Sequence, residues 1–284
     1  MRKIIKWLIT ILIILILITI YARYIGTNGL VTNEYIINDK TIPDSFDGLK
    51  IIHFSDIHYN RAINIKKIDD LVKEINLIDP DIVVFTGDLI DKDVDLNNSD
   101  YDKLTTTLKK INAKYGKYAV IGNHDYYKDI NKVKDVYEAS NFKYLENSYD
   151  IIYSTNNEKI FIGGLSTSTY KEADLEKTFS YFKDNEYINY KIILTHEPDI
   201  TTQIVKDYQV NLILAGHSHG GQIRLPILGP LYTPPYAKKY YDSHYKISDT
   251  NLYISSGIGV STINYRLNNP PSINFYRIFK EVSK

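Results

Sequence analysis

Short apolar runs alternate along this chain with longer amphipathic stretches. Five runs of four to six residues, rich in Ile and Val, are typical of strands buried on both faces, and they occupy residues 50–54, 81–86, 118–121, 191–195 and 211–215. Between and beyond them, apolar residues recur every three or four positions, which indicates helices with one buried face. These helices are expected at residues 65–75, 101–111, 129–140, 175–182 and 198–206. Such alternation predicts an α/β domain whose sheets are covered by helices.

Further strands and one long loop are expected in the second half of the chain. Residues 150–154 and 159–165 predict a hairpin that turns at Asn156–Asn157. Residues 252–255 and 273–279 predict two closing strands. The segment 224–246 combines prolines and glycines with many tyrosines, so we expect it to form a long functional loop.

The N-terminal segment is apolar enough to cross a membrane. Residues 7–22 are interrupted only by Thr10 and Thr19. The span reaches 19 residues, 4–22, if Ile4 and Ile5 are included and Lys6 extends its amine to the lipid headgroups. A bilayer requires about 20 residues of helix. A buried core helix is less suitable, because this segment is apolar all round. A cleaved signal peptide is the stronger alternative, but residues 21–24 lack its small-residue cleavage pattern. The sequence therefore predicts an uncleaved anchor at residues 1–24.

Charges around this segment indicate its orientation. Three basic residues and the amino terminus precede the apolar span, whereas one arginine follows it. The positive-inside rule then leaves the N-terminus in the cytoplasm and exports the rest of the chain. We expect a single-pass protein of the cell membrane whose main domain, at residues 49–284, is extracytoplasmic. Residues 25–48 are expected to form a tether or partly an opening strand.

Composition narrows the class of partner and the available chemistry. The chain has 34 basic and 34 acidic residues, and outside residues 1–24 the balance is 30 basic against 34 acidic. A mildly acidic domain argues against nucleic acid as the main partner, because binding to a phosphate backbone needs a basic face. The absence of cysteine excludes disulfides, thiolate metal sites and cysteine nucleophiles.

Each of the five apolar runs is followed directly by side chains that can bind a metal ion. These side chains are Asp56, His58, Asp88, Asn123, His196, His217 and His219. Ligands of open α/β folds bind outside the carboxyl ends of the strands, so the seven could meet at one rim. Taken singly, each has a common structural role as a helix cap, a turn residue or a core histidine. Of the remaining histidines, His53 lies inside the first apolar run and is expected to be structural, whereas His244 lies in the long loop and its role stays open.

The chemistry of the seven side chains favours two ions rather than one. Carboxylate, imidazole and amide oxygen suit divalent Mn, Fe or Zn. Seven ligands are too many for one tetrahedral ion, but they fit two ions that share a carboxylate, and Asp88 is placed to be that bridge. Two such ions would clamp a phosphoryl group for in-line displacement. The glycines before Asp88, Asn123 and His217 are expected to let the backbone turn sharply at the strand ends.

The ordered motifs resemble the calcineurin-like metallophosphoesterase superfamily. They are Asp56-x-His58, Gly87-Asp88, Gly122-Asn123-His124-Asp125, a single His196 and Gly216-His217-x-His219. The flanking stretches DIVVFTGDLID, GNHDYY, THEPD and ILAGHSHGGQIRLPILGP look like the membrane-anchored bacterial branch, which is similar to phosphoesterases that include UDP-2,3-diacylglucosamine hydrolases. The resemblance implies a four-layer α-β-β-α sandwich, here preceded by one transmembrane helix.

The resemblance also implies a role for each motif residue. The first metal would be held by Asp56, His58, Asp88 and His219, and the second by Asp88, Asn123, His196 and His217. His124 matches the histidine that protonates the leaving group or stabilises the transition state. Asp125 could orient His124.

The function expected from these features is that of a membrane-tethered phosphoesterase with two divalent metals, Mn first and Fe or Zn as alternatives. It would hydrolyse a phosphomonoester, phosphodiester or pyrophosphate bond by a metal-activated hydroxide, with His124 as general acid. The substrate is expected to be a phosphorylated envelope or lipid-linked compound, admitted beside the loop at residues 224–246. Two alternatives stay open: a broad-specificity nucleotide or cyclic-nucleotide phosphodiesterase, and a metal-binding scaffold without turnover.

Overall fold

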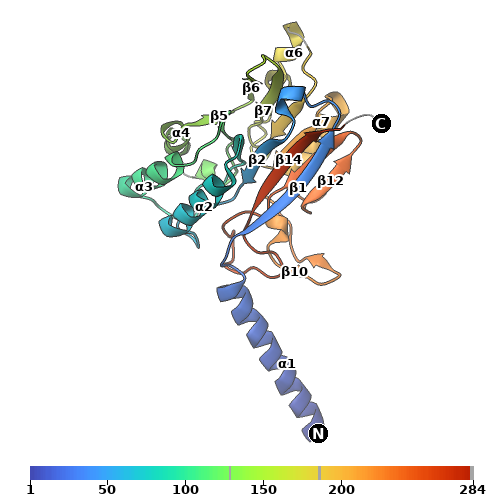
Figure 1. Cartoon of the computed structure of the whole chain (residues 1–284). Coiled ribbons are helices and arrows are strands. Elements are labelled where there is room, and N and C mark those ends of the chain that lie inside the picture. Colours follow the sequence, from blue (N-terminus) through green and yellow to red (C-terminus); the bar gives the residue numbers. More distant parts are fainter. Residues whose placement is uncertain (128, 185–186, 282–284) are drawn as a thin grey trace.

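In the computed structural model, two six-stranded sheets lie face to face with helices on their outer faces (Figure 1). The structure describes residues 1–127, 129–184 and 187–281, and the elements below belong to these residues. The first sheet has the order β1 (Val31–Asp39), β14 (Ser272–Lys280), β2 (Leu49–Phe54), β3 (Ile82–Phe85), β4 (Gly116–Ala119), β5 (Phe142–Tyr144). The second has the order β12 (His244–Ile247), β13 (Thr250–Ile254), β9 (Leu212–Ala215), β8 (Lys191–Leu194), β7 (Lys159–Gly164), β6 (Ser148–Tyr153).

Helices cover the two outer faces in separate groups. The first sheet is covered by α2 (Ile65–Ile78), α3 (Asn98–Lys109) and α4 (Ile130–Ala139), and the second by α5 (Leu175–Thr178), α6 (Tyr181–Asp184) and α7 (Thr201–Asp207). Local signals set their ends. The Asn64 side chain accepts a hydrogen bond from the backbone N–H of Lys67 at the start of α2, and Asn97 and Asp100 form a capping box at the start of α3.

The alternation of side chains along β2 explains the layers. Ile51 packs between the two sheets, against residues such as Leu194 of β8. Ile52 points the opposite way and packs under α2 with Ile68. A third apolar cluster, which includes Ile193 of β8, joins the second sheet to its helices. Strands buried on both faces need apolar residues at every position, which is why their sequences read as continuous apolar runs.

The expected four-layer α-β-β-α architecture is confirmed, and most elements lie where the pattern placed them. The hairpin expected at residues 150–154 and 159–165 is the antiparallel pair β6–β7. The helix expected at residues 175–182 is divided into the short helices α5 and α6. Strand β5 was not anticipated, whereas β1 lies in the segment expected to form a tether or partly an opening strand. The loop expected at residues 224–246 contains a hairpin of β10 (Arg224–Leu225) and β11 (Gly229–Pro230) and most of β12.

The N-terminal helix stands apart from the sandwich. It consists of α1 (Arg2–Ile20), continued by one turn of π-helix, η1 (Tyr21–Ile25), and the side chains of α1 are exposed. Among the described residues, this is the one helix long and apolar enough to be a candidate membrane span. At about 1.5 Å per residue, its 24 residues are long enough to cross a bilayer. Of residues 25–48, which the sequence predicts to be a tether or opening strand, 31–39 form β1.

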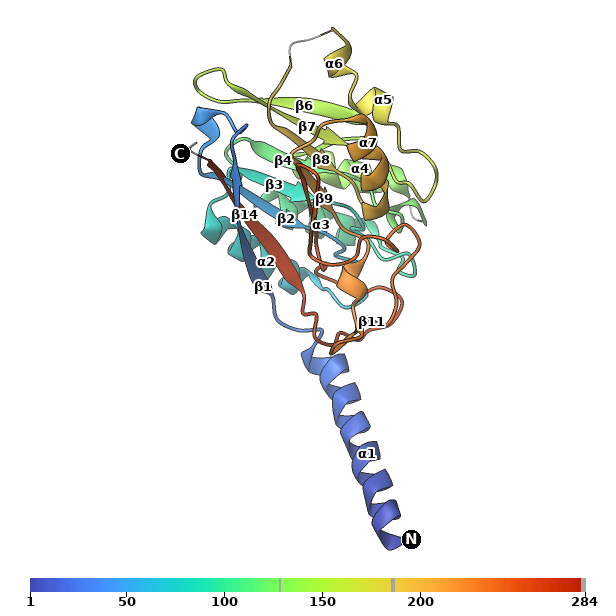
Figure 2. The ribbon, with the colours of Figure 1, turned by 90° about the vertical axis from the view of Figure 1, so that its right-hand side faces the viewer.

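The topology orients the sheets relative to this helix. Strand β1 starts at Val31, soon after the helix ends at Ile25, and it runs parallel to β14. Strand β14 is antiparallel to β2, and β3 and β4 run parallel to β2. The carboxyl ends of β2, β3 and β4 therefore point to the edge of the sheet from which the N-terminal helix leaves (Figure 2). Ligand sites of such sheets lie at the carboxyl ends.

Lys117 of β4 is a buried cation that links two helix ends. Its Nζ donates to the backbone carbonyl oxygens of Ser140, 2.6 Å away after α4, and of Leu108, 3.4 Å away in the last turn of α3. It also lies 4.9 Å from the centroid of the Phe142 ring. Carbonyl ends of helices favour a cation, but burial dominates and lowers the pKa of Lys117 to about 8.

This burial predicts a pH-dependent contribution to stability. Between pH 8 and the ordinary lysine value of about 10.4, the native state loses the Lys117 proton before the unfolded state does, so stability rises with pH. We expect the free energy of unfolding of the wild type to rise across this interval relative to that of Lys117→Met. Denaturant unfolding at several pH values would measure it, with the exposed Lys66→Met as a matched control. Parallel curves for the wild type and Lys117→Met would contradict the prediction.

Candidate metal centre

The seven side chains predicted to bind metal lie at the carboxyl ends of strands from both sheets. Asp56 and His58 follow β2, Asp88 follows β3, Asn123 follows β4, His196 follows β8, and His217 and His219 follow β9. All are buried except Asn123, which is partly buried. The fold thus brings residues from the two sheets to one buried place.

An unusual backbone conformation aims five of these side chains. Their φ angles are positive, at 51° for Asp56, 45° for His58, 58° for Asp88, 65° for His217 and 50° for His219. Positive φ is uncommon for residues other than glycine, and its cost is characteristically found at functional sites. The repetition of this conformation at three strand ends indicates that the backbone is shaped to present these side chains.

Two glycines beside Asp88 serve different purposes. Gly87 has a φ of 93°, as expected for a glycine that lets the chain turn. Gly122 is needed for close approach instead, because a Cβ at that position would lie 2.2 Å from Oδ1 of Asp88. The predicted turning role therefore applies to Gly87 but does not explain Gly122.

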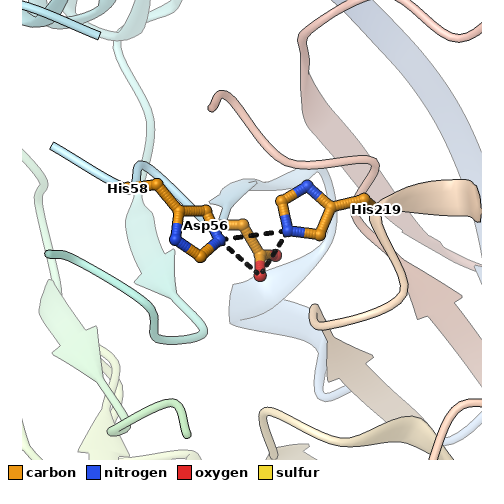
Figure 3. A group of neighbouring side chains, drawn as sticks. All are labelled: Asp56, His58 and His219. Carbon is orange, nitrogen blue, oxygen red and sulfur yellow. Dashed lines mark hydrogen bonds and ion pairs between the residues drawn. The ribbon is translucent and has the colours of Figure 1, made fainter. Parts of the chain in front are cut away.

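Asp56, His58 and His219 form the first cluster of donor atoms (Figure 3). Nε2 of His58 lies 3.1 Å from Nε2 of His219. Oδ1 of Asp56 lies 3.4 Å from Nε2 of His219 and 3.9 Å from Nε2 of His58. This oxygen is buried and has no hydrogen-bond partner among the described residues. A carboxylate oxygen and two imidazole nitrogens that converge in this way fit a cation between them.

Asp88 lies between the first cluster and a second one. Its Oδ2 is 3.6 Å from Nε2 of His58 and 3.3 Å from Nε2 of His196. Oδ1 of Asn123 lies 3.2 Å from the same nitrogen of His196. Nδ1 of His196 is 2.6 Å from the carbonyl oxygen of Thr86, which fixes the ring with Nε2 toward the carboxylates. Asp88 is thus positioned to be shared by two cations.

His217 lies beside the second cluster but engages one nitrogen elsewhere. Its ring packs edge-on against that of His196, with centroids 4.9 Å apart. Nε2 of His217 is 2.8 Å from the carbonyl oxygen of Pro235, and an N–H donated to this carbonyl leaves Nδ1 as the lone-pair nitrogen. The predicted ligand His217 would therefore bind a metal through Nδ1.

The electrostatics of the site favour bound cations. Burial lowers the pKa of His196, but the carboxylates of Asp88 and Asp56 outweigh it and hold that pKa well above its ordinary value. Burial also raises the pKa of Asp88, but His196 and His124 outweigh it and hold that pKa well below the ordinary value. Buried carboxylates that raise the pKa of an adjacent imidazole such as His196 create a negative field that a divalent ion would neutralise. The donor set fits two divalent ions.

His124 faces the same site without joining the predicted ligands. Its backbone N–H donates to Oδ1 of Asp88 at 2.7 Å. Its ring packs edge-on against His58, with centroids 4.6 Å apart, and its Nδ1 is buried without a hydrogen-bond partner among the described residues. Burial lowers the pKa of His124 to about 4. His124 lines the same cavity as several of the predicted ligands without being one of them.

The structure corrects the role expected for Asp125. Its carboxylate accepts hydrogen bonds from the backbone N–H groups of Asp88, Leu89 and Gly122, at 3.0, 2.9 and 3.0 Å. No hydrogen bond between the Asp125 side chain and the His124 ring is found in the described residues. Asp125 is fully buried and faces the backbone, so it fixes the turn that carries Asp88 rather than the orientation of His124.

Sequence patterns alone missed three residues that support the site. Oδ2 of Asp91 lies 3.4 Å from Nδ1 of His58 and holds that ring with Nε2 toward Asp56. Glu197, which follows His196 in the chain and is fully buried, accepts a hydrogen bond from the backbone N–H of Ser168. The fully buried guanidinium of Arg266 lies 3.5 Å from Nδ1 of His219. Asp91 lies close to Asp88 in the sequence and Glu197 follows His196, so the motifs could have indicated both. No sequence motif marks Arg266.

The two histidines with no predicted role at the site, His53 and His244, lie away from this cluster. His53 is fully buried, and its Nε2 lies 2.9 Å from the hydroxyl of Thr86. His244 is exposed on β12 and stacks on Tyr253. Their positions agree with a structural role for the first and a surface position for the second.

A cavity of about 580 Å³ opens beside the metal-ligand cluster. Asp88, Asn123, His124, His217 and His219 line its inner end. Its outer wall includes Leu231, Tyr232 and Tyr236, which belong to the loop predicted to flank the site. The cavity is therefore polar where the donor atoms converge and largely apolar toward solvent.

Residues 49–221 match the family model of calcineurin-like phosphoesterases. The chain belongs to this family. The match includes every predicted metal ligand, and members of the calcineurin-like phosphoesterase family normally bind two divalent metals, in agreement with the donor clusters described above. Membership also makes the chain a hydrolase.

Three relatives within the calcineurin-like phosphoesterases extend the match beyond the motifs. The chain is 35% identical to "Uncharacterized metallophosphoesterase YkuE" of Bacillus subtilis, over 91% of this chain and 88% of the relative. It is 24% identical to "Phosphodiesterase YaeI" of Escherichia coli, over 83% and 84%. It is 27% identical to "Transmembrane protein with metallophosphoesterase domain" of Danio rerio, over 80% of this chain and 52% of the relative. The narrower likeness to UDP-2,3-diacylglucosamine hydrolases stays a prediction.

A solved structure shows the same fold in a distant protein. The sulfate thiohydrolase SoxB of Thermus thermophilus superposes with a TM-score of 0.51 and 10% sequence identity. The superposition covers 84% of this chain and 57% of that one. At this identity the likeness concerns the fold alone.

Proposed function

We propose that this chain is a membrane-tethered phosphoesterase that uses two divalent metal ions to hydrolyse a phosphomonoester, phosphodiester or pyrophosphate bond. The observation that carries the proposal is the position of Asp88. Its Oδ2 lies 3.6 Å from His58 and 3.3 Å from His196, so one carboxylate can serve both donor clusters. Both clusters face a cavity large enough for a phosphorylated compound.

The two ions would occupy overlapping ligand sets. The first set is Asp56, His58, Asp88 and His219, and the second is Asp88, Asn123, His196 and His217. When bound, the ions, which we propose to be Mn²⁺ with Fe or Zn as alternatives, supply Lewis acidity toward the phosphoryl oxygens and lower the pKa of a water molecule.

Residues of the chain hold these ligands and assist the leaving group. Asp91 and the carbonyl oxygen of Thr86 fix the rings of His58 and His196, so their Nε2 atoms stay directed at the carboxylates. His124 lines the same cavity, and its Nδ1 has no hydrogen-bond partner among the described residues. We assign it to the leaving-group oxygen, to which it would donate a proton or a hydrogen bond.

The substrate is proposed to be a phosphorylated envelope or lipid-linked compound. The N-terminal helix would tether the enzyme to the cell membrane, with the N-terminus in the cytoplasm and the catalytic domain outside, as the three basic residues before the span favour. The carboxyl ends of β2, β3 and β4, and hence the metal site, lie toward this helix. A site on that side is within reach of phosphates on the membrane surface.

A substrate panel tests the proposal. The full chain, reconstituted in lipid nanodiscs, would be assayed with p-nitrophenyl phosphate, bis(p-nitrophenyl) phosphate, pyrophosphate, nucleotides and cyclic nucleotides, each with Mn²⁺, Mg²⁺, Zn²⁺ or Fe²⁺. We expect metal-dependent hydrolysis of at least one model ester and slow turnover of the nucleotides. Fast turnover confined to nucleotides would favour the alternative phosphodiesterase. Bound metal without any hydrolysis would indicate a scaffold.

A further inference from the structure

The hairpin β10–β11 presents apolar side chains to solvent. Its tip consists of Ile227 and Leu228, which are 104% and 78% exposed. Among the described residues, no other large apolar side chain is as exposed as Ile227. Leu231 and Tyr232, just beyond β11, are 61% and 65% exposed. A contiguous apolar patch of this kind marks a surface that contacts something apolar.

The backbone at the tip is strained in a way that keeps Ile227 exposed. Its φ is 68°, and the N–H of Leu228 donates to the carbonyl oxygen of Pro226 at 2.8 Å, which closes a tight turn around Ile227. A β-branched residue at positive φ is an outlier, and glycine or asparagine would occupy the position at lower cost. An isoleucine that neither packs against the domain nor suits the turn indicates a role for its side chain outside the domain.

Hydrogen bonds fix the hairpin beside the end of the membrane helix. The backbone N–H of Arg224, the first residue of β10, donates to the carbonyl oxygen of Leu267 at 2.9 Å. Arg266, the residue before Leu267, donates its backbone N–H to the carbonyl oxygen of Ala22 at 2.9 Å. Two consecutive residues therefore hold the base of the hairpin and the last turn of the helix. Figure 1 shows the hairpin on the side of the domain from which α1 leaves.

The residues on either side of the hairpin, Ile223 and Leu231, line the metal-site cavity. Leu231 and Tyr232 line the cavity together with Ile263, which is 47% exposed. Gln222, another lining residue, donates a side-chain hydrogen bond to the carbonyl oxygen of Ile263 at 2.8 Å. The mouth of the cavity thus opens between apolar residues on the side of the domain that the helix would bring against a bilayer.

We propose that the β10–β11 hairpin is a second membrane contact of this protein. Ile227 and Leu228 enter the boundary between headgroups and acyl chains of the bilayer that α1 spans, and they hold the cavity mouth at its surface. The site then takes phosphoesters of amphiphiles anchored in that bilayer, with the lipid tail along the apolar wall and the phosphate at the metals. The membrane contact stands independently, whereas the amphiphilic substrate class rests on the proposed function.

Tryptophan fluorescence tests the membrane contact without reference to activity. The chain has a single tryptophan, Trp7, within α1, so Trp7→Phe combined with Leu228→Trp places one fluorophore at the hairpin tip. In nanodiscs we expect blue-shifted emission that brominated lipids quench, as they quench Trp7 in the wild type. Trp7→Phe combined with Leu77→Trp, at an exposed position on α2, is the matched control and should not be quenched. Unquenched emission from Leu228→Trp would overturn the membrane contact. This holds even if another protein or a second copy of this chain covers the hairpin tip instead.

A rate comparison tests the substrate class. The double variant Ile227→Asp/Leu228→Asp should hydrolyse bis(p-nitrophenyl) phosphate at the wild-type rate, because neither residue lines the cavity. It should hydrolyse a diacylglycerol p-nitrophenyl phosphodiester, incorporated in the same nanodiscs, several-fold more slowly than the wild type, whereas Leu77→Asp should not. Equal rates on the lipid would overturn the amphiphile assignment. A wild type inactive on both esters would instead refute the proposed function, and the fluorescence result would stand.

Discussion

Replacing Asp88 with Asn is expected to reduce hydrolysis by orders of magnitude, because one carboxylate positions both metal ions. Oδ2 of Asp88 lies within 3.6 Å of Nε2 of both His58 and His196, and the side chain is buried. The substitution removes the negative charge and places an amide beside imidazole nitrogens. Oδ1 also accepts the backbone N–H of His124, a bond that the amide oxygen of Asn can still accept.

The measurement for Asp88→Asn combines turnover of bis(p-nitrophenyl) phosphate with the number of metal ions bound per chain. We expect fewer ions and a severe loss of turnover. Asp93→Asn, which changes an exposed carboxylate in the same segment, is the matched control and should retain both. Near-wild-type turnover in Asp88→Asn, with metal content unchanged, would refute the shared-carboxylate account.

Replacing His124 with Ala is expected to spare the metals and slow the chemistry. The ring of His124 is not among the predicted ligands, and the hydrogen bond to Asp88 comes from its backbone, so truncating the side chain leaves both intact. Loss of a general acid costs roughly 10²–10⁴-fold in rate for a poor leaving group. The loss should be smaller for p-nitrophenyl esters, whose leaving oxygen needs no proton.

Steady-state rates on an alkyl and an aryl phosphoester would measure this difference for His124→Ala, together with metal content. His124→Asn separates the two roles considered for the ring, because its amide donates a hydrogen bond but cannot transfer a proton. Rescue by Asn would indicate stabilisation of the transition state by a hydrogen bond. An equal loss on both esters would argue against proton donation to the leaving group and for a positioning role.

The sequence was sufficient for the central strands of both sheets and for the edge strand β6, but not for every edge strand. Strands such as β2 and β8 are buried on both faces, so continuous apolar runs identify them. Strand β1 is at an edge and carries polar residues such as Asn33 and Glu34 among its apolar ones, and its pairing with β14 joins segments from opposite ends of the chain. Such a strand is defined by its tertiary partner more than by its own pattern.

The candidate ligands were predictable because each follows a strand whose end is visible in the sequence. The residues that support these ligands were harder to predict, because their roles depend on contacts between segments that are distant in the sequence. Arg266 contacts His219 from a loop that precedes β14, and nothing in its neighbourhood marks it. Asp125 sits inside a recognisable motif, yet its carboxylate faces the backbone of Asp88 and Gly122 rather than the ring of His124. A motif places a residue near a site, but the direction of its side chain is settled by packing.

The central claim is that two ions, shared through Asp88, are required for hydrolysis. Its most direct test is a metal titration of the full chain in nanodiscs after chelation, with bound metal counted by mass spectrometry and turnover of bis(p-nitrophenyl) phosphate measured in the same samples. The account predicts no turnover without metal, two ions per chain at saturation, and activity that rises with occupation of the second site. Turnover by the metal-free chain, or full activity with a single bound ion, would contradict it.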